Sequence, residues 1–594
     1  MERAATAAEP LDDLLPAPVL SLQRAVRFGL IGGMAAVVVA AIGMVETFEA
    51  RTLIDPFLAL GLTTLYLASF TFGFVAGSPP PEREGFAKPK AGLRSLAAGA
   101  IAGVLAGVVL SAFMLLADAV NLRNIFVSVS PQLLELLTFG KGLGTGILLV
   151  LVVSTAVGVA GSAVHLIPAQ VRRPIMYTVM WVLLVGLLQS VIEPVFRGLG
   201  LPSLIDVLYE EAGGLRLAGV VIVAAAVFLL SFFLGGKGRA LQGRLDALPA
   251  QRRRSYISIL LLVAAAIVYM IPRVVGPFLS EVLDLAGLYL LMALGLNIVI
   301  GYAGLLDLGY VAFFAVGAYT TAILTSPNSP RFTPEMTLWA SLPFVVLAAA
   351  LAGLLVGTPV LRMRGDYLAI VTLGFGEIAR ILLNSDALKE TFGGAQGIIN
   401  IPNMVIGPLT VRGPEVFFYP IFIFAILAGY VSLAIQNSRM GRAWMAMRED
   451  ELVAETMGVN IVAAKLSAFV VGASLASIGG ALFAVKVGSV FPSSFNIVVS
   501  ITILVLIIVG GMGSVPGVTV GALALVALPE LLREFNEYKF LMYGILLIFM
   551  MLKRPEGFIP SKRRALELHQ DEVLQDAWLQ IYGDEETGPQ EEGV

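Results

Sequence analysis

The sequence predicts an all-α integral membrane protein that crosses the bilayer many times. Of its 594 residues, 58% are hydrophobic and only 14% are charged, whereas soluble domains are about a quarter charged. Long apolar runs recur along the whole chain, and each run is expected to be helical, because an isolated strand would leave backbone polar groups unpaired in lipid. Since one span needs roughly 20 mostly apolar residues, we expect about 16 transmembrane helices.

The candidate spans form two groups. The first six begin near residues 25, 53, 94, 143, 175 and 216. The other ten begin near residues 256, 278, 305, 337, 366, 417, 465, 497, 515 and 540. The basic stretch 235–255 separates the groups and is the candidate linker. The expected organisation is therefore an N-terminal tail (1–20), a membrane extension (21–234), the linker (235–255), a second membrane domain (256–560) and an acidic tail (561–594).

Lysine and arginine predict the orientation, because they are retained on the cytoplasmic side of a membrane. In the first half, the loops 82–94, 171–174 and 235–254 carry four, two and six of them, twelve in all. The intervening loops carry five, namely Arg51, Arg123, Lys141, Arg197 and Arg216. This bias predicts a cytoplasmic N-terminus, and an even number of spans predicts a cytoplasmic C-terminus.

The composition argues against catalysis by this chain. There is no cysteine and there are two histidines, which removes thiol nucleophiles and the usual zinc ligands. No GxxxxGK[ST] phosphate-binding loop is present. We expect no catalytic residue, no cofactor and no metal, and if the protein uses ATP, the ATPase is another chain.

The largest polar insertion between spans of the second half is NSRMGRAWMAMREDELVAETMGVNIVAAKLSAF, residues 437–469. Gly458 follows a helix-favouring stretch, at the position where a helix end favours glycine. As a bare pattern, a solvated connector explains this loop as well as a functional one does. The order GRAxxAxREdelxAExxGVNxxxxK, followed by a helix rich in small residues, favours the functional interpretation.

This loop closely resembles the coupling loop of ABC importer permeases, in particular the LivM-type permeases of branched-chain amino-acid importers. Five further stretches match that family in order and spacing over about 256–560. They are GLNIVIGYAGLLDLGYVAFFAVGAYTTAIL (295–324), RMRGDYLAIVTLGFGEIARIL (362–382), FGGAQGI (392–398), GGMGSVPGVTVGALAL (510–525) and LKRPEGFIP (552–560).

The resemblance implies a permease subunit of the bacterial inner membrane for branched-chain or related small amino acids. Its implied partners are a second, LivH-like permease, two ABC ATPases and an extracytoplasmic amino-acid-binding protein. The loop would fit a groove on the ATPase. Its implied coupling residues are Gly441, Arg442, Ala443, Arg448, Glu449, Glu455, Gly458 and Lys465.

Polar residues and glycines interrupt the apolar run 295–309. Asn297, Gly301, Tyr302, Gly304 and Asp307 are candidates for a helix break or for the lining of the pathway, since unwound backbone at membrane depth is tolerated beside protein or a water-filled cavity. The alternative is close helix packing by the glycines with an interfacial aspartate. The family usually has Ser before the Leu-Gly pair and His or Gln after it, where this chain has Asp307 and Tyr310.

Two smaller features complete the candidate sites. Glu377 and Arg380 are spaced i, i+3 and can meet on one helix face, either as a self-neutralising pair or at a gate or subunit interface. Gly393, Gly394 and Gln396 fall in an expected external loop, where either a binding protein docks or a simple turn requires glycine.

The sequence is also compatible with two other functions. An ion-coupled secondary transporter would use buried acidic residues, for which Asp307 and Glu377 are the candidates. A membrane scaffold or regulatory subunit would make residues 1–250 the functional part, although a buttress for the permease explains that extension as well.

Overall fold

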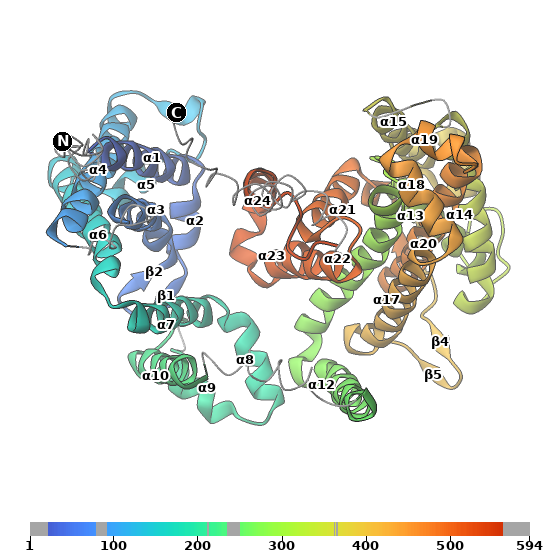
Figure 1. Ribbon diagram of the computed structural model, residues 1–594, viewed down its shortest axis with the longest axis horizontal. Helices are drawn as coiled ribbons and strands as arrows, with labels where there is room; N and C mark the ends of the chain where they lie inside the picture. The colour runs from blue at the N-terminus through green and yellow to red at the C-terminus, as the bar shows by residue number, and fades with distance from the viewer. Residues whose placement is uncertain are drawn as a thin grey trace, which may run out of the picture. The chain divides into compact units, whose positions relative to one another are not determined.

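The computed structural model describes residues 22–78, 92–210, 213–234, 250–360, 363 and 366–561, and there the chain is mainly helical (Figure 1). The expected N-terminal tail, nearly all of the acidic tail and most of the basic linker lie outside these residues. The chain divides into an N-terminal unit, Met1–Leu260, and a C-terminal unit, Leu261–Val594.

The N-terminal unit contains a bundle of four long helices joined through small residues. These are α1 (Leu22–Ala41), α3 (Leu60–Gly77), α4 (Leu93–Ala119) and α6 (Leu143–Ala163). A Cβ atom on Gly73 of α3 would lie 2.4 Å from the carbonyl oxygen of Gly158 on α6. Glycine therefore allows these backbones to touch, which is how helices associate without a hydrophobic driving force between them.

Shorter elements complete this unit. They are α2 (Met44–Glu49), β1 (Thr52–Ile54), β2 (Leu58–Ala59), η2 (Leu122–Asn124), α5 (Pro131–Leu137), η3 (Val164–Leu166), α7 (Ala169–Leu187), α8 (Gln189–Gly198), α9 (Pro202–Leu208) and α10 (Leu217–Leu234). The strands β1 and β2 pair antiparallel, and α7 packs against α10.

The C-terminal unit is built around α20. Its long helices after α12 (Ala250–Leu296) are α13 (Val311–Thr325), α14 (Leu338–Val360), α15 (Asp366–Asn384), α17 (Pro414–Gln436), α20 (Ile461–Val487), α21 (Ile497–Gly510) and α24 (Lys539–Lys553). A kink interrupts α12 at Gly276, whose φ is +75°. The helices α13 and α14 both pack along α20, and Figure 1 shows the three side by side.

The remaining elements of this unit are short. They are the π-helix η4 (Asn297–Tyr302), η5 (Asp386–Leu388), α16 (Lys389–Phe392), η6 (Gly394–Gln396), β3 (Ile398–Ile399), β4 (Val405–Ile406), β5 (Leu409–Thr410), α18 (Arg439–Glu449), α19 (Glu451–Thr456), β6 (Ser489–Val490), η7 (Pro492–Ser494), α22 (Val515–Ala522), the π-helix η8 (Leu523–Ala527), α23 (Leu528–Leu531) and η9 (Arg533–Tyr538). β3 pairs antiparallel with β6, and β4 with β5.

Glycine sets the spacing between α13 and α20. A Cβ on Gly317 of α13 would lie 2.0 Å from the carbonyl oxygen of Ser477, and a Cβ on Gly480 of α20 would lie 2.0 Å from that of Phe314. Neither backbone can yield without moving its whole helix. These two glycines therefore fix how closely the central pair of helices packs.

Replacing Gly317 by alanine is expected to lower the melting temperature of the purified protein, because the helices must separate and overpacking costs about 1–3 kcal/mol. The matched control is Gly374→Ala on α15, where an added Cβ meets no atom within 4 Å. Gly374→Ala should melt no lower than the original chain, since alanine is the better helix former. Equal melting temperatures for the two variants would contradict this account of the packing.

Eleven helices among the described residues are long and apolar enough to cross a membrane, or twelve if the bent pair Pro174–Leu187 and Gln189–Gly198 forms one span. Three of the other expected spans carry shorter apolar helices, within Leu217–Leu229, Val311–Thr325 and Val515–Leu531. The expected spans near 256 and 278 both fall on α12, which runs through the kink at Gly276. The polytopic all-α prediction is confirmed, and the number sixteen stays a prediction.

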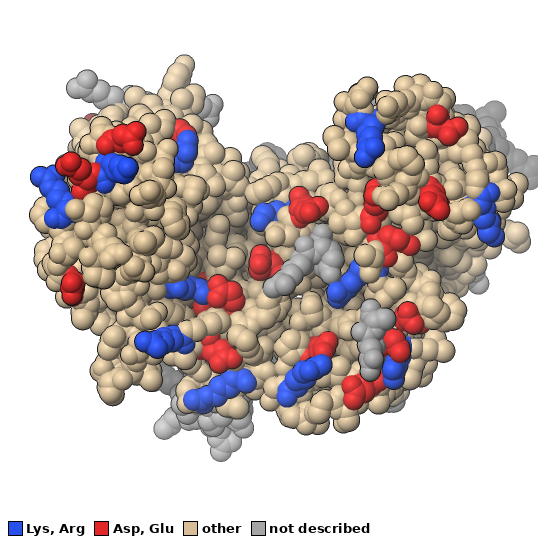
Figure 2. All heavy atoms as spheres, turned by 180° about the vertical axis from the view of Figure 1, so that it is seen from behind, with Lys and Arg blue, Asp and Glu red and all other residues tan. Residues whose placement is uncertain are grey.

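The surface fits a membrane environment. Figure 2 shows that lysine, arginine, aspartate and glutamate cover a small part of the face displayed there. Many large apolar side chains are exposed on the long helices, such as Leu355 on α14 and Leu427 on α17. Exposure of these apolar side chains is favourable when they are surrounded by lipid.

Candidate functional site

The polar loop between α17 and α20 folds into two short helices, α18 and α19. Three side chains cap the helix starts. Ser438 Oγ accepts from Gly441 N at 3.2 Å, Asp450 Oδ1 accepts from Leu452 N at 2.8 Å and Val453 N at 3.0 Å, and Asn460 Oδ1 accepts from Ala463 N at 3.0 Å. Such caps satisfy backbone N–H groups that a helix start leaves free. The caps therefore stabilise the helices of the loop.

Trp444 fastens α18 to α20. Its side chain is fully buried, and its indole Nε1 donates to Ala464 O at 2.9 Å and to Ser467 Oγ at 3.1 Å. Trp444 is not among the coupling residues that the resemblance implies. A tryptophan within an otherwise charged loop was the signal in the sequence that pointed to it.

Lys465 fastens α19 to α20. Its Nζ lies 2.7 Å from Glu451 Oε1, with the two side chains 2% and 24% exposed. The resemblance implies that Lys465 belongs to the coupling loop. Because its side chain is only 2% exposed, Lys465 holds the loop in place from inside.

Of the other expected coupling residues, some are buried in the protein and others are exposed on the loop surface. Gly441 is buried, and a Cβ there would lie 2.2 Å from Ile435 O, so only glycine lets α18 fold back on α17. Gly458 ends α19 with a φ of +87°, a conformation that favours glycine. Arg442 donates from Nη1 to Asn437 O at 2.9 Å. Ala443 is half-buried, and Glu449 and Glu455 are exposed.

The expected helix break is present. Residues 297–302 form a π-helix, and residues 303–310 are not helical. Asn297 Oδ1 accepts from Gly513 N at 2.8 Å, and the hydroxyl groups of Tyr302 and Ser432 lie 3.1 Å apart. Gly304 follows with a φ of +73°. The break is therefore held by side chains and backbone of α17 and of the 511–514 turn.

Arg448 joins the break to the polar loop, two features that are far apart in sequence. From α18, its Nη1 donates to Gly301 O at 2.7 Å. Its stem lies against Gly304, where an added Cβ would come within 2.6 Å of Arg448 Cγ. Interrupting a helix leaves backbone carbonyl groups without hydrogen-bond donors. Arg448 supplies a donor for the carbonyl group of Gly301. The sequence named both ends of this contact but not the contact itself.

A cavity of about 600 Å³ opens where the loop and the break meet. Tyr302, Gln436, Arg448, Glu449 and Pro516 lie in its wall. It thus has both charged groups and apolar surface beside the break. Movement of α18 would change its shape directly.

Asp307 lies inside the protein. Its side chain is 1% exposed, and its Oδ1 accepts from Gly309 N at 2.9 Å, which closes the turn after the break. The carboxylate of Asp307 is therefore enclosed by protein. Oδ2 has no hydrogen-bond partner in the described part of the chain.

The remaining candidates occupy α15 and the loop after it. Arg380 Nε donates to Glu377 Oε1 at 3.0 Å and to Oε2 at 3.1 Å, so the expected pair forms, with both side chains about one-third exposed. Gly393 and Gly394 have φ of +82° and +58° and are buried, whereas Gln396 is exposed. A Cβ on Gly393 would lie 2.1 Å from Gly397 O, so the turn itself requires glycine there.

Comparison with known proteins identifies relatives of this chain. A family model for the branched-chain amino acid transport system permease component matches residues 278–551. The high-affinity branched-chain amino acid transport system permease protein LivM of Escherichia coli is 38% identical over 60% of this chain and 89% of its own length. LivM of Salmonella typhimurium is 39% identical over 53% and 77%.

The similarity extends to a second kind of permease. LivH of Escherichia coli, also named as a permease protein of that transport system, is 25% identical over 46% of this chain and 92% of its own length. No solved structure matches the chain significantly.

Proposed function

Because this chain belongs to the family of branched-chain amino acid transport permeases, we propose that it is the transmembrane permease subunit of an ATP-driven importer for branched-chain or related small amino acids. The transport substrate is the one that its relatives are named for. The observation that supports the proposal most strongly is the contact of Arg448 with Gly301. It connects an exposed, capped loop to an interrupted membrane helix.

The proposed mechanism follows from that connection. Closure of a separate ATPase pair pushes on α18 and α19, which move together because they are capped and joined to α20 through Trp444 and Lys465. Arg448 carries the same movement to the break after α12. A π-helical segment is a common site of functional rearrangement. The pathway then opens to one side of the membrane at a time.

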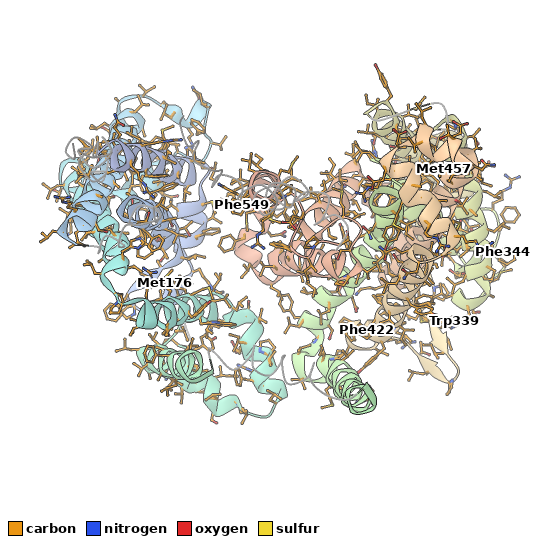
Figure 3. The ribbon with its side chains drawn as sticks, in the orientation of Figure 1. Met176, Trp339, Phe344, Phe422, Met457 and Phe549 are labelled. Carbon is orange, nitrogen blue, oxygen red and sulfur yellow. The ribbon has the colours of Figure 1, made fainter. Side chains whose placement is uncertain are left out.

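The outer face of α19 offers a surface for the ATPase. Leu452, Val453 and Met457 are 60%, 58% and 80% exposed, although the loop that carries them is otherwise polar. Figure 3 labels Met457, which directly follows α19. Exposed apolar side chains rimmed by charges mark protein-binding sites, and Arg442, Glu449 and Glu455 supply the rim and fix the orientation of docking.

Replacing Met457 by aspartate is expected to reduce the amount of ATPase that copurifies with the chain by about tenfold or more, because a buried anchor at an interface often contributes over 2 kcal/mol. Leu409→Asp is the matched control, since Leu409 is also an exposed apolar residue (56%) but lies on the β4–β5 hairpin. The ratio of ATPase to permease is measured in gently solubilised membranes. An unchanged ratio for Met457→Asp would refute this docking surface.

Contacts at the two ends of the C-terminal unit support the proposed orientation. At the end assigned to the outside, Ser326 Oγ donates to Ile399 O at 2.7 Å and Ile401 N donates to Gly488 O at 2.9 Å. At the end assigned to the cytoplasm, Ile559 N donates to Gly510 O at 3.0 Å. Segments that the alternation of spans assigns to one side thus contact one another. We propose about 16 spans in the bacterial inner membrane with both termini cytoplasmic.

The proposed assembly contains a LivH-like permease, two ABC ATPases and an extracytoplasmic amino-acid-binding protein. The similarity of the chain to both LivM and LivH supports a pair of related permeases. The exposed Gln396, beside the turn at Gly393, is a candidate contact for the binding protein. The N-terminal unit is proposed to buttress the permease.

One observation favours a second candidate function, an ion-coupled transporter that needs no ATPase. Asp307 is a buried carboxylate with one oxygen that lacks a hydrogen-bond partner among the described residues, as a coupling site for a cation would require. The exposed loop 437–465 has no purpose in that mechanism, and the relatives are named as permease proteins of a transport system with more than one component.

A further inference from the structure

A second cavity lies near the other end of the C-terminal unit, far from the helix break. Its volume is about 200 Å³, and its wall includes Leu285 and Tyr289 of α12. These residues precede Gly301 by 12 to 16 positions, which is roughly 20 Å along a helix. The start of α21 and the start of α24 close its other sides. In the proposed orientation this cavity faces the outside.

The cavity combines apolar walls with opposite charges. Leu285, Val498 and Val526 form part of the apolar wall, and the carboxylate-bearing Glu530 and the ammonium-bearing Lys539 line the same space. Both charged residues are half-buried. Neither has an ion-pair partner among the side chains that the structure describes. Lys539 Nζ instead lies 5.5 Å from the ring centre of Phe540.

A third polar group in the wall lacks a partner. Asn536 Oδ1 is buried, and no hydrogen bond to it is formed within the described residues. Buried polar atoms are rarely left unsatisfied, so an acceptor, an acid and a base that all lack partners among the described side chains indicate a ligand. Typical binding sites for drug-sized molecules have volumes of about 300–1,000 Å³. This cavity is smaller, at about 200 Å³, so the ligand is small.

We propose that this cavity is an outer subsite for a free α-amino acid with an apolar side chain. Glu530 pairs with the ammonium group, Lys539 pairs with the carboxylate, and the apolar wall receives the side chain. Asn536 accepts a further hydrogen bond from the ammonium group. The subsite deepens the proposed transport function, on which it rests, by giving the permease its own recognition of the zwitterion after release from a binding protein.

The test uses the complete purified complex in lipid nanodiscs without binding protein. Saturable binding of radiolabelled leucine is measured for the original complex and for Glu530→Gln and Lys539→Gln variants. Each variant should bind leucine at least about tenfold more weakly, because each loses a hydrogen bond between charged groups. Glu537→Gln is the matched control, since Glu537 is exposed and does not line the cavity.

Ligand analogues test the two charges separately. Isoamylamine lacks the carboxylate of leucine and 4-methylpentanoate lacks the ammonium group, so neither should compete with leucine.

Nanodiscs of phosphatidylglycerol alone are compared with nanodiscs containing phosphatidylethanolamine, whose head group also carries an ammonium and an anion. Loss of leucine binding in phosphatidylethanolamine would assign the cavity to a lipid head group and overturn the proposal.

Other outcomes separate this inference from the transport function. Unchanged leucine affinity in both variants, or absence of leucine binding while the original complex still imports leucine with ATP, would overturn the subsite and leave the importer standing. Variants that bind leucine normally but lose stimulation of ATPase activity by the binding protein would make Glu530 and Lys539 a docking contact instead. Failure of the original complex to import any branched-chain amino acid would refute the transport function itself. Melting temperatures show whether each variant is folded.

Discussion

Replacing Arg448 by methionine is expected to lower leucine uptake sharply while the ATPase partners continue to hydrolyse ATP. Methionine keeps much of the apolar stem that packs on Gly304 but cannot donate to Gly301 O, which Arg448 Nη1 contacts at 2.7 Å. A hydrogen bond from a charged group contributes about 1.5–3 kcal/mol, so uptake per ATP hydrolysed should fall about tenfold or more. The measurement is leucine uptake and phosphate release from the same proteoliposomes.

Arg439→Met is the matched control for this prediction. It removes the same group from the same helix, but Arg439 is exposed and does not line the cavity beside the break. Uptake per ATP should remain close to that of the original chain. If Arg448→Met transports with the original efficiency, the loop does not act through Gly301 and the proposed mechanism is wrong.

Replacing Glu451 by glutamine is expected to destabilise the polar loop strongly. The change takes the carboxylate away from Lys465, whose side chain is 2% exposed and lies 2.7 Å from it. Removing one partner of a buried ion pair costs about 3–5 kcal/mol, because the other charge stays buried and uncompensated. A lower melting temperature and faster proteolysis within residues 437–465 would report this loss.

The double variant Glu451→Leu with Lys465→Met separates charge burial from a general effect of substitution. Replacing both partners by apolar residues is often neutral or stabilising, so the double variant should melt well above Glu451→Gln. If the single and double variants melt at the same low temperature, the ion pair is not what holds α19 against α20.

The sequence located the features of the site but not the contacts among them. Glycines at 301 and 304 predicted a helix break, because they interrupt an otherwise apolar run, and the break is there. Its partner Arg448 lies 147 positions away in the chain, and no local pattern specifies a contact across such a distance.

Burial by tertiary packing explains the other differences between the sequence-based expectations and the structure. Lys465 and Gly441 stand in a charged stretch, where composition suggests solvent exposure, yet both are buried against neighbouring helices. Asp307 is buried for the same reason, since tertiary packing and not the local sequence decides which polar groups are enclosed. Apolar runs alone do not fix the number of spans, because the spans expected to begin near 305 and 515 carry apolar helices shorter than a full span, within Val311–Thr325 and Val515–Leu531.

The most direct test of the account is leucine uptake by this chain and its copurified partners in proteoliposomes, compared with uptake by the chain alone. The proposed importer predicts uptake that requires enclosed ATP, the ATPase partners and a binding protein, with Arg448→Met uncoupled. Accumulation of leucine by the chain alone, driven by an ion gradient in the absence of ATP, would contradict the account and make Asp307 the coupling site.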